Sequence, residues 1–335
     1  MISRNISLKP YNTFGLDYKA DCLVTIESET EAASFFRDKT FCHEPLLIIG
    51  EGSNILFTGD FKGTVIFSRI EEIKVEDKHP RYIIVSVGAG VKWDYFVEWC
   101  VSNGYGGVEN LSLIPGLTGA APVQNIGAYG MEVKETITKV KTISIANGSV
   151  REFSNEECMF GYRDSIFKRY LKNKFLVTKV FFKLSTIPSF KLDYGILKKE
   201  VLKLGEVNLA NVRQAVINIR SRNLPDPRIF GNAGSFFKNP VVSMTEANKI
   251  IRKYPDIPNY HDDSGGIKLA AGWMIEQCGW KGKRMGDAGI HDRQALVLVN
   301  YGNATGRELL ALSEKVRQSV QEKFGILLER EVEVI

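Results

Sequence analysis

The sequence predicts an α+β fold, because strand-like and helix-like patterns occur as separate runs and not as a regular strand–helix–strand repeat. Residues 137–145 and 175–184 alternate apolar and polar side chains, which is typical of strands buried on one face. Residues 93–100 instead place their apolar side chains at helical spacing. The chain of 335 residues is long enough for two or three domains.

The first half of the chain predicts a strand-rich region that ends in one helix. Short apolar runs predict strands at residues 46–49, 55–57, 64–67 and 82–87. A stretch punctuated by glycine and proline then covers residues 111–130. A helical pattern at residues 211–222 stops before Leu-Pro-Asp-Pro at 224–227, where two prolines stiffen the chain and a domain boundary is expected.

The second half predicts helices that begin at capping residues. Ser243 and Thr305 each stand three residues before a glutamate, which is the spacing of a capping box. The helix after Thr305 carries an apolar stripe and is expected to end near Gly325. We also expect a helix at residues 269–277, a buried strand at 295–299 and an extended tail at 326–335.

Composition and charge exclude several classes of protein. The net charge of 44 − 39 = +5 is spread along the chain and lacks the basic patch of a nucleic-acid-binding protein. No window approaches the roughly 20 apolar residues of a membrane span. The four histidines show no metal-ligand spacing, so no metal site is expected. The odd number of scattered cysteines (Cys22, Cys42, Cys100, Cys158, Cys278) indicates reduced thiols in a cytoplasmic protein.

The run from Gly231 to Pro240 combines the groups that a buried polar ligand needs. It reads Gly-Asn-Ala-Gly-Ser-Phe-Phe-Lys-Asn-Pro, so one loop offers the Ser235 hydroxyl, the Lys238 ammonium and the Asn239 amide beside two aromatic rings. Polar groups beside an apolar wall are typical of a ligand site. The alternative is a tight turn between two packed elements.

Two glycine-rich segments favour a ligand bound against the backbone. Residues 50–54 follow a strand, and their successive N–H groups form a nest for an anion, although a plain turn has the same composition. This loop has neither the Gly-Lys-Ser/Thr ending of a P-loop nor the third glycine of a dinucleotide fingerprint. Residues 113–130 are dense in small side chains and leave room for a flat or extended ligand.

Two charged positions have both a catalytic and a structural interpretation. The Arg163 guanidinium matches a carboxylate or phosphate with two hydrogen bonds, but it could equally form a surface pair with Asp164. Glu331 belongs to the run Glu-Arg-Glu-Val-Glu, which by itself is typical of a solvated edge strand.

Taken together, these segments resemble the UDP-N-acetylenolpyruvoylglucosamine reductases of bacterial peptidoglycan synthesis. The resemblance covers nearly the whole chain in the right order, through residues 12–15, 50–54, 114–130, 161–165, 224–227, 231–240 and 269–273. Tyr194, within Leu-Asp-Tyr-Gly, resembles the type I branch.

The resemblance implies a two-subdomain FAD-binding region, similar to vanillyl-alcohol oxidase, followed by an α+β substrate-binding domain. The implied segments are a first FAD subdomain at residues 1–68, to which the C-terminal tail contributes, and a second at 69–222. The substrate domain is expected at 223–325, and a C-terminal strand at 326–335 carries Glu331.

The resemblance also implies which residues bind FAD. The nest would hold the pyrophosphate, and the second glycine-rich segment would line the flavin and part of the substrate pocket. The implied residues are Gly50, Glu51, Gly52, Ser53, Asn54, Ile114, Pro115, Gly116, Gly119, Ala120, Gln124, Asn125, Gly127, Ala128, Tyr129 and Arg220.

The implied reaction has two halves on one site. NADPH reduces FAD and leaves, and the enolpyruvyl sugar nucleotide then takes a hydride at its terminal vinyl carbon to give UDP-N-acetylmuramate. Arg163 would neutralise the substrate carboxylate, Ser235 would protonate the adjacent carbon, and Glu331 would polarise the enol end or relay protons. Because serine is a weak acid, Lys238 or a water would have to poise its hydroxyl.

The residues implied to hold the UDP-sugar are Tyr129, Tyr194, Lys238, Asn239, Lys281 and Gln294. Asn223 departs from the lysine that often precedes Leu-Pro-Asp-Pro in the family, and the neighbouring Arg222 could substitute for it. This departure bears on phosphate affinity and not on the reaction class. We expect a cytoplasmic monomer whose partner is this small molecule, and neither nucleic acid nor a membrane.

Three alternatives stay open. An oxidase or dehydrogenase of the same flavin superfamily would not explain Ser235 and Glu331 together with the run at 231–240. A non-catalytic nucleotide-binding or scaffold protein would be favoured by loss of Arg163, Ser235 or Glu331, and all three are present. A nucleic-acid-binding protein is motivated only by the isoelectric point of about 8.8.

Overall fold

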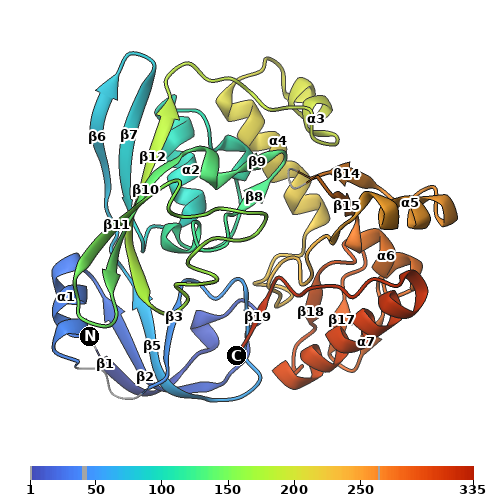
Figure 1. Cartoon of the computed structure of the whole chain (residues 1–335), viewed down its shortest axis with the longest axis horizontal. Coiled ribbons are helices and arrows are strands. Elements are labelled where there is room, and N and C mark those ends of the chain that lie inside the picture. Colours follow the sequence, from blue (N-terminus) through green and yellow to red (C-terminus); the bar gives the residue numbers. More distant parts are fainter. Residues whose placement is uncertain (1, 40–43, 263–264) are drawn as a thin grey trace. The chain divides into compact units, whose positions relative to one another are not determined.

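The computed structural model describes residues 2–39, 44–262 and 265–335, and the chain divides into two compact units (Figure 1). The first unit comprises Met1–Ile6, Lys19–Glu51 and Phe61–Arg222, and the second comprises Ser7–Tyr18, Gly52–Asp60 and Asn223–Ile335. Each unit is therefore assembled from stretches that lie far apart in the sequence.

A four-stranded sheet forms one layer of the first unit. Its order is β1 (Ile2–Ser7), β2 (Lys19–Ile26), β5 (Phe61–Ser68) and β3 (Leu46–Ile49). β5 pairs in parallel with both β2 and β3. Helix α1 (Glu29–Arg37) begins at Ser28, whose hydroxyl accepts a hydrogen bond from the Glu31 N–H, and it buries Phe35 and Phe36 in the core of this layer.

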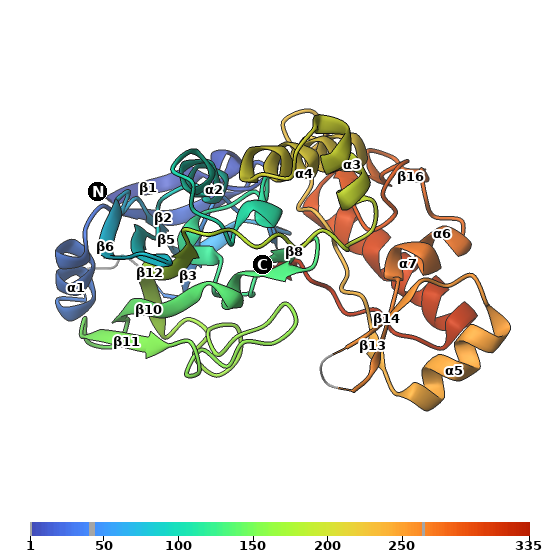
Figure 2. The same ribbon diagram turned by 90° about the horizontal axis from the view of Figure 1, so that it is seen from above.

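A five-stranded antiparallel sheet forms the other layer of the first unit (Figure 2). Its order is β11 (Val150–Ser154), β10 (Ile137–Ser144), β12 (Phe175–Ser185), β7 (Tyr82–Gly88) and β6 (Ile73–His79). Helix α2 (Trp93–Ser102) covers it, because the Trp93 and Phe96 rings lie 5.9 and 4.7 Å from that of Phe182. The strand patterns at 137–145 and 175–184 are confirmed.

Short elements lie between α2 and β10 in the first unit, and two further helices follow β12. The short elements are the 3-10 turns η2 (Glu109–Leu111), η3 (Thr118–Ala120) and η4 (Val133–Glu135), and the hairpin of β8 (Gly127–Ala128) and β9 (Met131–Glu132). Helices α3 (Leu197–Leu204) and α4 (Leu209–Asn223) share a separate apolar core, on which Tyr129 also packs.

The second unit consists of short strands around one long helix. Its elements are η1 (Lys9–Tyr11), β4 (Ile55–Leu56), β13 (Val241–Val242), α5 (Met244–Lys253), β14 (Asn259–His261), β15 (Ile267–Leu269), α6 (Ala271–Gln277), β16 (Arg284–Met285), β17 (Ala288–Ile290), β18 (Leu298–Asn300), α7 (Gly306–Phe324) and β19 (Glu333–Val334). Helix α7 packs on α6 and on the strands β17 and β18. Strand β19 pairs in parallel with β4, so the C-terminal tail joins a segment from the beginning of the chain.

The predicted helix ends are confirmed where they depend on local capping. Thr305 and Glu308 form both hydrogen bonds of a capping box, and α7 ends at Gly325 with a left-handed φ of 75°. The Ser243 hydroxyl likewise accepts a hydrogen bond from the Glu246 N–H at the start of α5.

Two predicted boundaries in the second unit need correction. The helix expected at 269–277 starts only at Ala271, because Leu269 pairs with Asn259 in the sheet of β15 and β14. The strand expected at 295–299 is Leu298–Asn300, because the Val297 N–H donates to the Gln294 carbonyl and closes a turn.

The cysteines differ in part from the expectation. Cys100 and Cys158 are buried free thiols and Cys278 is a half-buried one, whereas Cys22 is disulfide-bonded, so reduced thiols are wrong for that residue. Cys42 lies outside the described residues. Among the helices of the described ranges, none is long and apolar enough to cross a membrane.

The start of α7 lies against the backbone of the segment after β4. A Cβ atom added at Gly306 would come closer than 3.0 Å to the Phe57 carbonyl, a separation that real Cβ atoms essentially never show. Since both partners are backbone, the contact can be relieved only by moving one segment away from the other.

We therefore expect Gly306→Ala to lower the free energy of unfolding by about 3 kcal/mol, because overpacking of this kind forces the backbone apart. Urea unfolding followed by far-UV circular dichroism measures the change. Gly59→Ala is the matched control, since nothing lies within 4 Å of a Cβ placed there. Equal stability of the two variants would contradict the packing argument.

Candidate active site

The two glycine-rich segments predicted from the sequence meet in the first unit. A Cβ placed at Gly50 would lie 3.6 Å from the Ala120 Cβ and 3.7 Å from that of Leu117. The Glu51 carboxylate accepts a hydrogen bond of 3.0 Å from the Gly116 N–H. Glu51 therefore ties the start of the first segment, residues 50–51, to the second.

The N-terminus of α2 fixes the second glycine-rich segment. The Asp94 carboxylate accepts the Leu113 N–H at 2.5 Å and forms two hydrogen bonds with the Arg213 guanidinium at 2.6 and 3.0 Å. The Trp93 N–H donates to the Gly116 carbonyl at 2.9 Å. Burial raises the pKa of Asp94, but hydrogen bonds from Arg213 and Leu113 outweigh it, so this pKa lies below its ordinary value.

Asp94 and Arg213 are not among the residues predicted from the sequence. They stand 119 positions apart, and neither belongs to a recognisable motif. Gly119, which the resemblance assigns to the cofactor, has a packing role: a Cβ there would come within 2.6 Å of the Ala89 Cβ. Pairs of this kind become visible only in the folded chain.

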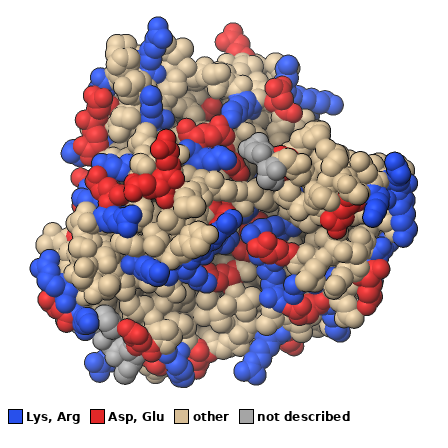
Figure 3. Space-filling model, viewed as in Figure 1, with Lys and Arg blue, Asp and Glu red and all other residues tan. Residues whose placement is uncertain are grey.

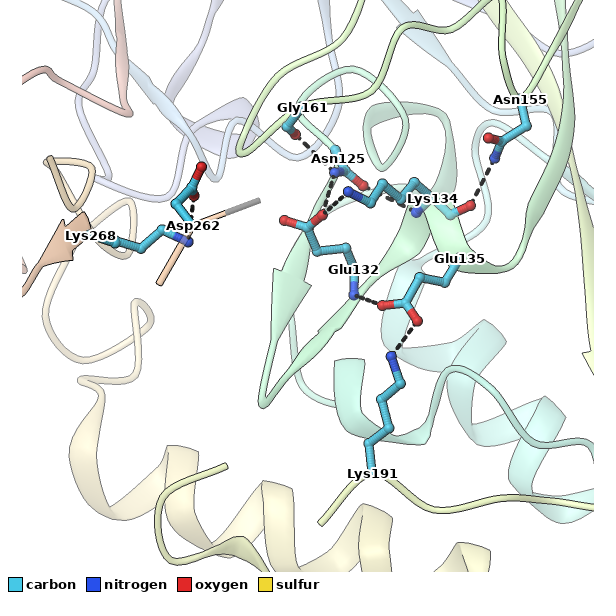
Figure 4. A network of polar contacts seen from close by, with 9 residues as sticks. All are labelled: Asn125, Glu132, Lys134, Glu135, Asn155, Gly161, Lys191, Asp262 and Lys268. Atoms are coloured by element: carbon cyan, nitrogen blue, oxygen red, sulfur yellow. Dashed lines mark hydrogen bonds and ion pairs between the residues drawn. The ribbon is translucent and has the colours of Figure 1, made fainter. Parts of the chain in front are cut away.

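Asn125 organises the segment that follows (Figure 4). Its amide donates to the Gly161 carbonyl at 2.9 Å and to the Glu132 carboxylate at 3.0 Å, and its oxygen accepts the Lys134 N–H at 3.1 Å. The side chain is fully buried. Asn125 therefore uses its hydrogen-bonding groups to join the loop of Arg163 to the hairpin of β8 and β9.

Arg163 lies against this hairpin. Its guanidinium donates to the Gly127 carbonyl at 2.6 Å, and it has a positive φ of 54°. The Asp164 carboxylate of the same loop forms an ion pair with Arg169. The guanidinium is therefore held beside the glycine-rich segment.

Tyr129, Tyr194 and Arg220 gather near the same hairpin. The two tyrosine rings meet edge to face with centroids 5.9 Å apart. The Arg220 Nε atom is buried and has no hydrogen-bond partner among the described residues. Burial lowers the pKa of Arg220 and raises that of Tyr129, and their mutual attraction opposes both shifts.

In the second unit, the extended segment that contains Ser235 forms backbone hydrogen bonds along both of its edges. The Phe236 N–H donates to the Leu296 carbonyl at 2.8 Å on one side. On the other, the Phe236 carbonyl accepts the Glu331 N–H at 2.9 Å and the Lys238 N–H donates to Glu329. Ser235 and Glu331 therefore stand on neighbouring backbone segments, and both are half-buried.

The other predicted substrate residues of the second unit already have partners within the protein. The Lys238 ammonium pairs with Glu329 at 2.5 Å, and that of Lys281 pairs with Glu276 at 3.0 Å. The Asn239 side-chain oxygen accepts the Ala271 N–H at the start of α6. The Gln294 oxygen accepts a long hydrogen bond of 3.4 Å from the Leu296 N–H.

The second half of the predicted nest belongs to the second unit. A Cβ at Gly52 would come closer than 3.0 Å to the Tyr11 carbonyl, so this position requires glycine. The Asn54 amide donates to the Glu331 carbonyl at 3.1 Å, and the Asn54 carbonyl accepts the Glu333 N–H at 3.0 Å. Asn54 thus holds the backbone of Glu331.

Family models match both parts of the chain. A model described as "FAD binding domain" matches residues 20–154. A second, described as "UDP-N-acetylenolpyruvoylglucosamine reductase, C-terminal domain", matches residues 226–335.

Curated relatives match the chain over its whole length. A UDP-N-acetylenolpyruvoylglucosamine reductase of Bacteroides fragilis is 48% identical over 334 residues, which is 100% of both chains. One of Flavobacterium johnsoniae is 44% identical and covers 100% of this chain and 99% of its own. The solved reductase of Thermus caldophilus has a TM-score of 0.71 at 26% identity, over 100% of this chain and 98% of that one. The chain therefore belongs to the UDP-N-acetylenolpyruvoylglucosamine reductase family, as its motifs predicted.

Proposed function

We propose that this FAD-dependent reductase acts on its UDP-sugar through Arg163, Ser235 and Glu331. The reaction is inferred from membership of the family, at 44–48% identity over the full length. It is the reduction of UDP-N-acetylenolpyruvoylglucosamine with NADPH in peptidoglycan precursor synthesis. The pairing of the Ser235 and Glu331 segments is the observation that best supports the assignment of roles.

We assign FAD to residues 50–54, residues 114–129 and Arg220. These residues fit the group, because the Arg220 Nε is a buried donor that lacks an acceptor among the described residues. When bound, FAD accepts a hydride from NADPH and delivers it to the substrate's vinyl carbon. The chain's own residues bind it, orient it and exclude water.

Arg163 binds the substrate carboxylate in this proposal. Negative charge develops on that carboxylate and on the adjacent carbon during reduction, and a fixed cation stabilises it. The hydrogen bond to the Gly127 carbonyl and the Asn125 bond to Gly161 support a guanidinium that is already oriented before substrate arrives.

Ser235 donates the proton to the carbon that bears the carboxylate, and Glu331 relays protons beside it. The serine's segment is fixed by backbone hydrogen bonds on both edges, which favours accurate placement of its Oγ atom. Because serine is a weak acid, we propose that Lys238 or a water molecule poises its hydroxyl. The Lys238 ammonium is paired with Glu329 in the structure.

The remaining substrate contacts are proposed at Tyr129, Tyr194, Lys238, Asn239, Lys281 and Gln294. The edge-to-face pair of Tyr129 and Tyr194 supports an aromatic wall for the UDP-sugar. Arg222, which replaces the lysine missing at Asn223, lies 3.4 Å from Glu200 and would have to exchange this partner for a phosphate.

We further propose a cytoplasmic monomer divided at residues 1–68, 69–222, 223–325 and 326–335. The change of sheet after β5 and the end of α4 at Asn223 support the boundaries at 68 and 222, and β19 pairs with β4, which lies within residues 1–68.

The surface charge gives little support to the nucleic-acid alternative. On the face drawn in Figure 3, lysine and arginine side chains are interspersed with aspartate and glutamate. A nucleic-acid site needs a continuous basic surface to hold successive phosphates.

We expect Ser235→Ala to leave flavin reduction by NADPH unchanged and to slow flavin reoxidation by UDP-N-acetylenolpyruvoylglucosamine by about 10²-fold or more, because the proton donor is lost. Anaerobic stopped-flow absorbance of the flavin measures both halves. Ser319→Ala, at a half-buried serine of α7 outside the proposed site, is the matched control. Equal loss in both halves would refute the role, and a protein that never binds FAD would refute the proposed function as a whole.

We expect Glu331→Gln to give the same split between the two half-reactions while substrate affinity is retained, since the amide keeps the shape of the side chain but cannot relay a proton. The same stopped-flow traces test it, with Glu333→Gln on the same tail as the control. If Glu331→Gln unfolds the protein, Glu331 is a structural residue of the tail.

We expect Asp94→Asn to weaken FAD binding and to lower the free energy of unfolding by about 1–2 kcal/mol at pH 7, because a charged hydrogen-bond pair is lost. The lowered pKa of Asp94 means that its contribution is present above the ordinary carboxyl pKa of about 3.9 and is lost as pH falls through the folded value.

The gap in urea midpoint between wild type and Asp94→Asn should therefore be largest near neutral pH and close in acid. Glu152→Gln, which removes an exposed pair with Lys139, is the control and should change little. A gap that persists unchanged at low pH would contradict the electrostatic explanation.

A further inference from the structure

The buried side chain of Asn110 hydrogen-bonds to the backbone at Tyr129 and to the backbone just before Tyr194. Asn110 lies in η2 and is 2% exposed. Its amide nitrogen donates to the Tyr129 carbonyl and to the Lys191 carbonyl, both at 2.8 Å. These partners stand 19 and 81 positions away along the chain, and a primary amide has only two hydrogens to give.

The segment that carries Tyr194 has little secondary structure of its own. Residues 186–196 join β12 to α3 without a strand or helix. Phe190 and Leu192 pack on the core of α3 and α4, whereas the side chain of Lys191 between them is exposed. The Asn110 bond at Lys191 is therefore a main-chain anchor close before Tyr194.

A second anchor acts on the same residue through its side chain. The Lys191 ammonium pairs with the Glu135 carboxylate, whose other oxygen accepts the Glu132 N–H at 3.0 Å (Figure 4). Glu132 in turn accepts the Asn125 amide, which also binds the Gly161 carbonyl. The network thus runs from the Arg163 loop through the hairpin to the Tyr194 segment.

We propose that Asn110 is a positioning residue that sets Tyr194 against Tyr129 and so determines affinity for the UDP-sugar. The inference rests on the proposed role of the two tyrosines in substrate binding. Without the amide, the Tyr129 and Lys191 carbonyls lose a shared donor, and the segment before Tyr194 keeps the Lys191 ion pair and the packing of Phe190 and Leu192. Substrate binding must then order that segment, and the entropy lost in doing so lowers the affinity for the UDP-sugar.

Asn110→Leu keeps a similar volume and removes both hydrogen bonds. We expect KM for UDP-N-acetylenolpyruvoylglucosamine, and Kd for UDP-N-acetylmuramate measured calorimetrically on the oxidised holoprotein, to rise about tenfold, as two lost hydrogen bonds imply. The rate of flavin reduction by NADPH and kcat should stay within about twofold, because no group that meets the reacting atoms changes.

Asn155→Leu is the matched control. The Asn155 amide also donates to two backbone carbonyls of the first unit, those of Lys134 and Ile137, at 2.8 and 2.7 Å, but to none of residues 186–196. It should leave KM and Kd near their original values. An equal rise of KM and Kd in both variants would overturn the proposal, because a general loss of rigidity in the first unit would then explain the weaker binding.

A double-mutant cycle tests whether Asn110 acts through Tyr194. Tyr194 is 51% exposed, so Tyr194→Ala should fold. In the Tyr194→Ala background, Asn110→Leu should raise Kd by less than about twofold, whereas an undiminished tenfold rise would overturn the proposal. If Tyr194→Ala by itself leaves Kd unchanged, it is the proposed role of Tyr194 that fails.

Lys191→Met keeps the test decisive if Asn110→Leu does not fold. It removes only the ion pair of a side chain that is 52% exposed, and it should raise Kd about threefold without changing flavin reduction. Unchanged Kd in Lys191→Met and in any folded Asn110 variant would overturn the assignment of this anchor.

Discussion

The second unit depends on two places where backbone lies directly against a glycine. Gly52 meets the Tyr11 carbonyl and Gly231 meets that of Phe14, each at a separation that no Cβ would tolerate. The Asn300 amide bonds the same Phe14 carbonyl, and its N–H donates to Gly231. These contacts join residues 7–18 and 52–60 to the C-terminal part of the chain. Glycines of two segments that the sequence predicted as ligand-binding are therefore required by packing within the protein.

The contacts have a consequence for the candidate catalytic residues. Once Gly231 is fixed, the chain enters an extended segment that is bonded on one edge to residues 296–297 and on the other to residues 329–331. Phe236 and Phe237 are buried there, so Ser235 cannot move without disturbing the core. The tail of Glu331 is held in turn by Asn54 and by the pairing of β19 with β4. Placement of these groups therefore follows from backbone hydrogen bonds, to which the Asn54 side chain adds one.

Sequence reasoning succeeded where structure depends on near neighbours and on whole motifs. The Thr305 capping box and the left-handed helix end at Gly325 require only local residues, and the order of the motifs identified the family. The Asp94–Arg213 pair and the Asn110 bridge were missed, because their partners are 119 and 81 positions away. Asn125 was predicted as a cofactor residue on its motif alone. Its amide and carbonyl are engaged within the protein, a fact that no spacing of letters reveals.

Arg220, in the first unit, is a buried cation in an unfavourable environment. Burial lowers the pKa of Arg220, and the nearby charge of Arg163 lowers it further, while Tyr129 and Asp94 oppose the shift. A buried guanidinium nitrogen without an acceptor among the described residues adds to the cost. An anionic ligand would offset these effects, since it supplies both an opposite charge and an acceptor. Burying Arg220 therefore lowers the stability of the folded chain before any ligand arrives, and binding an anion regains part of that free energy.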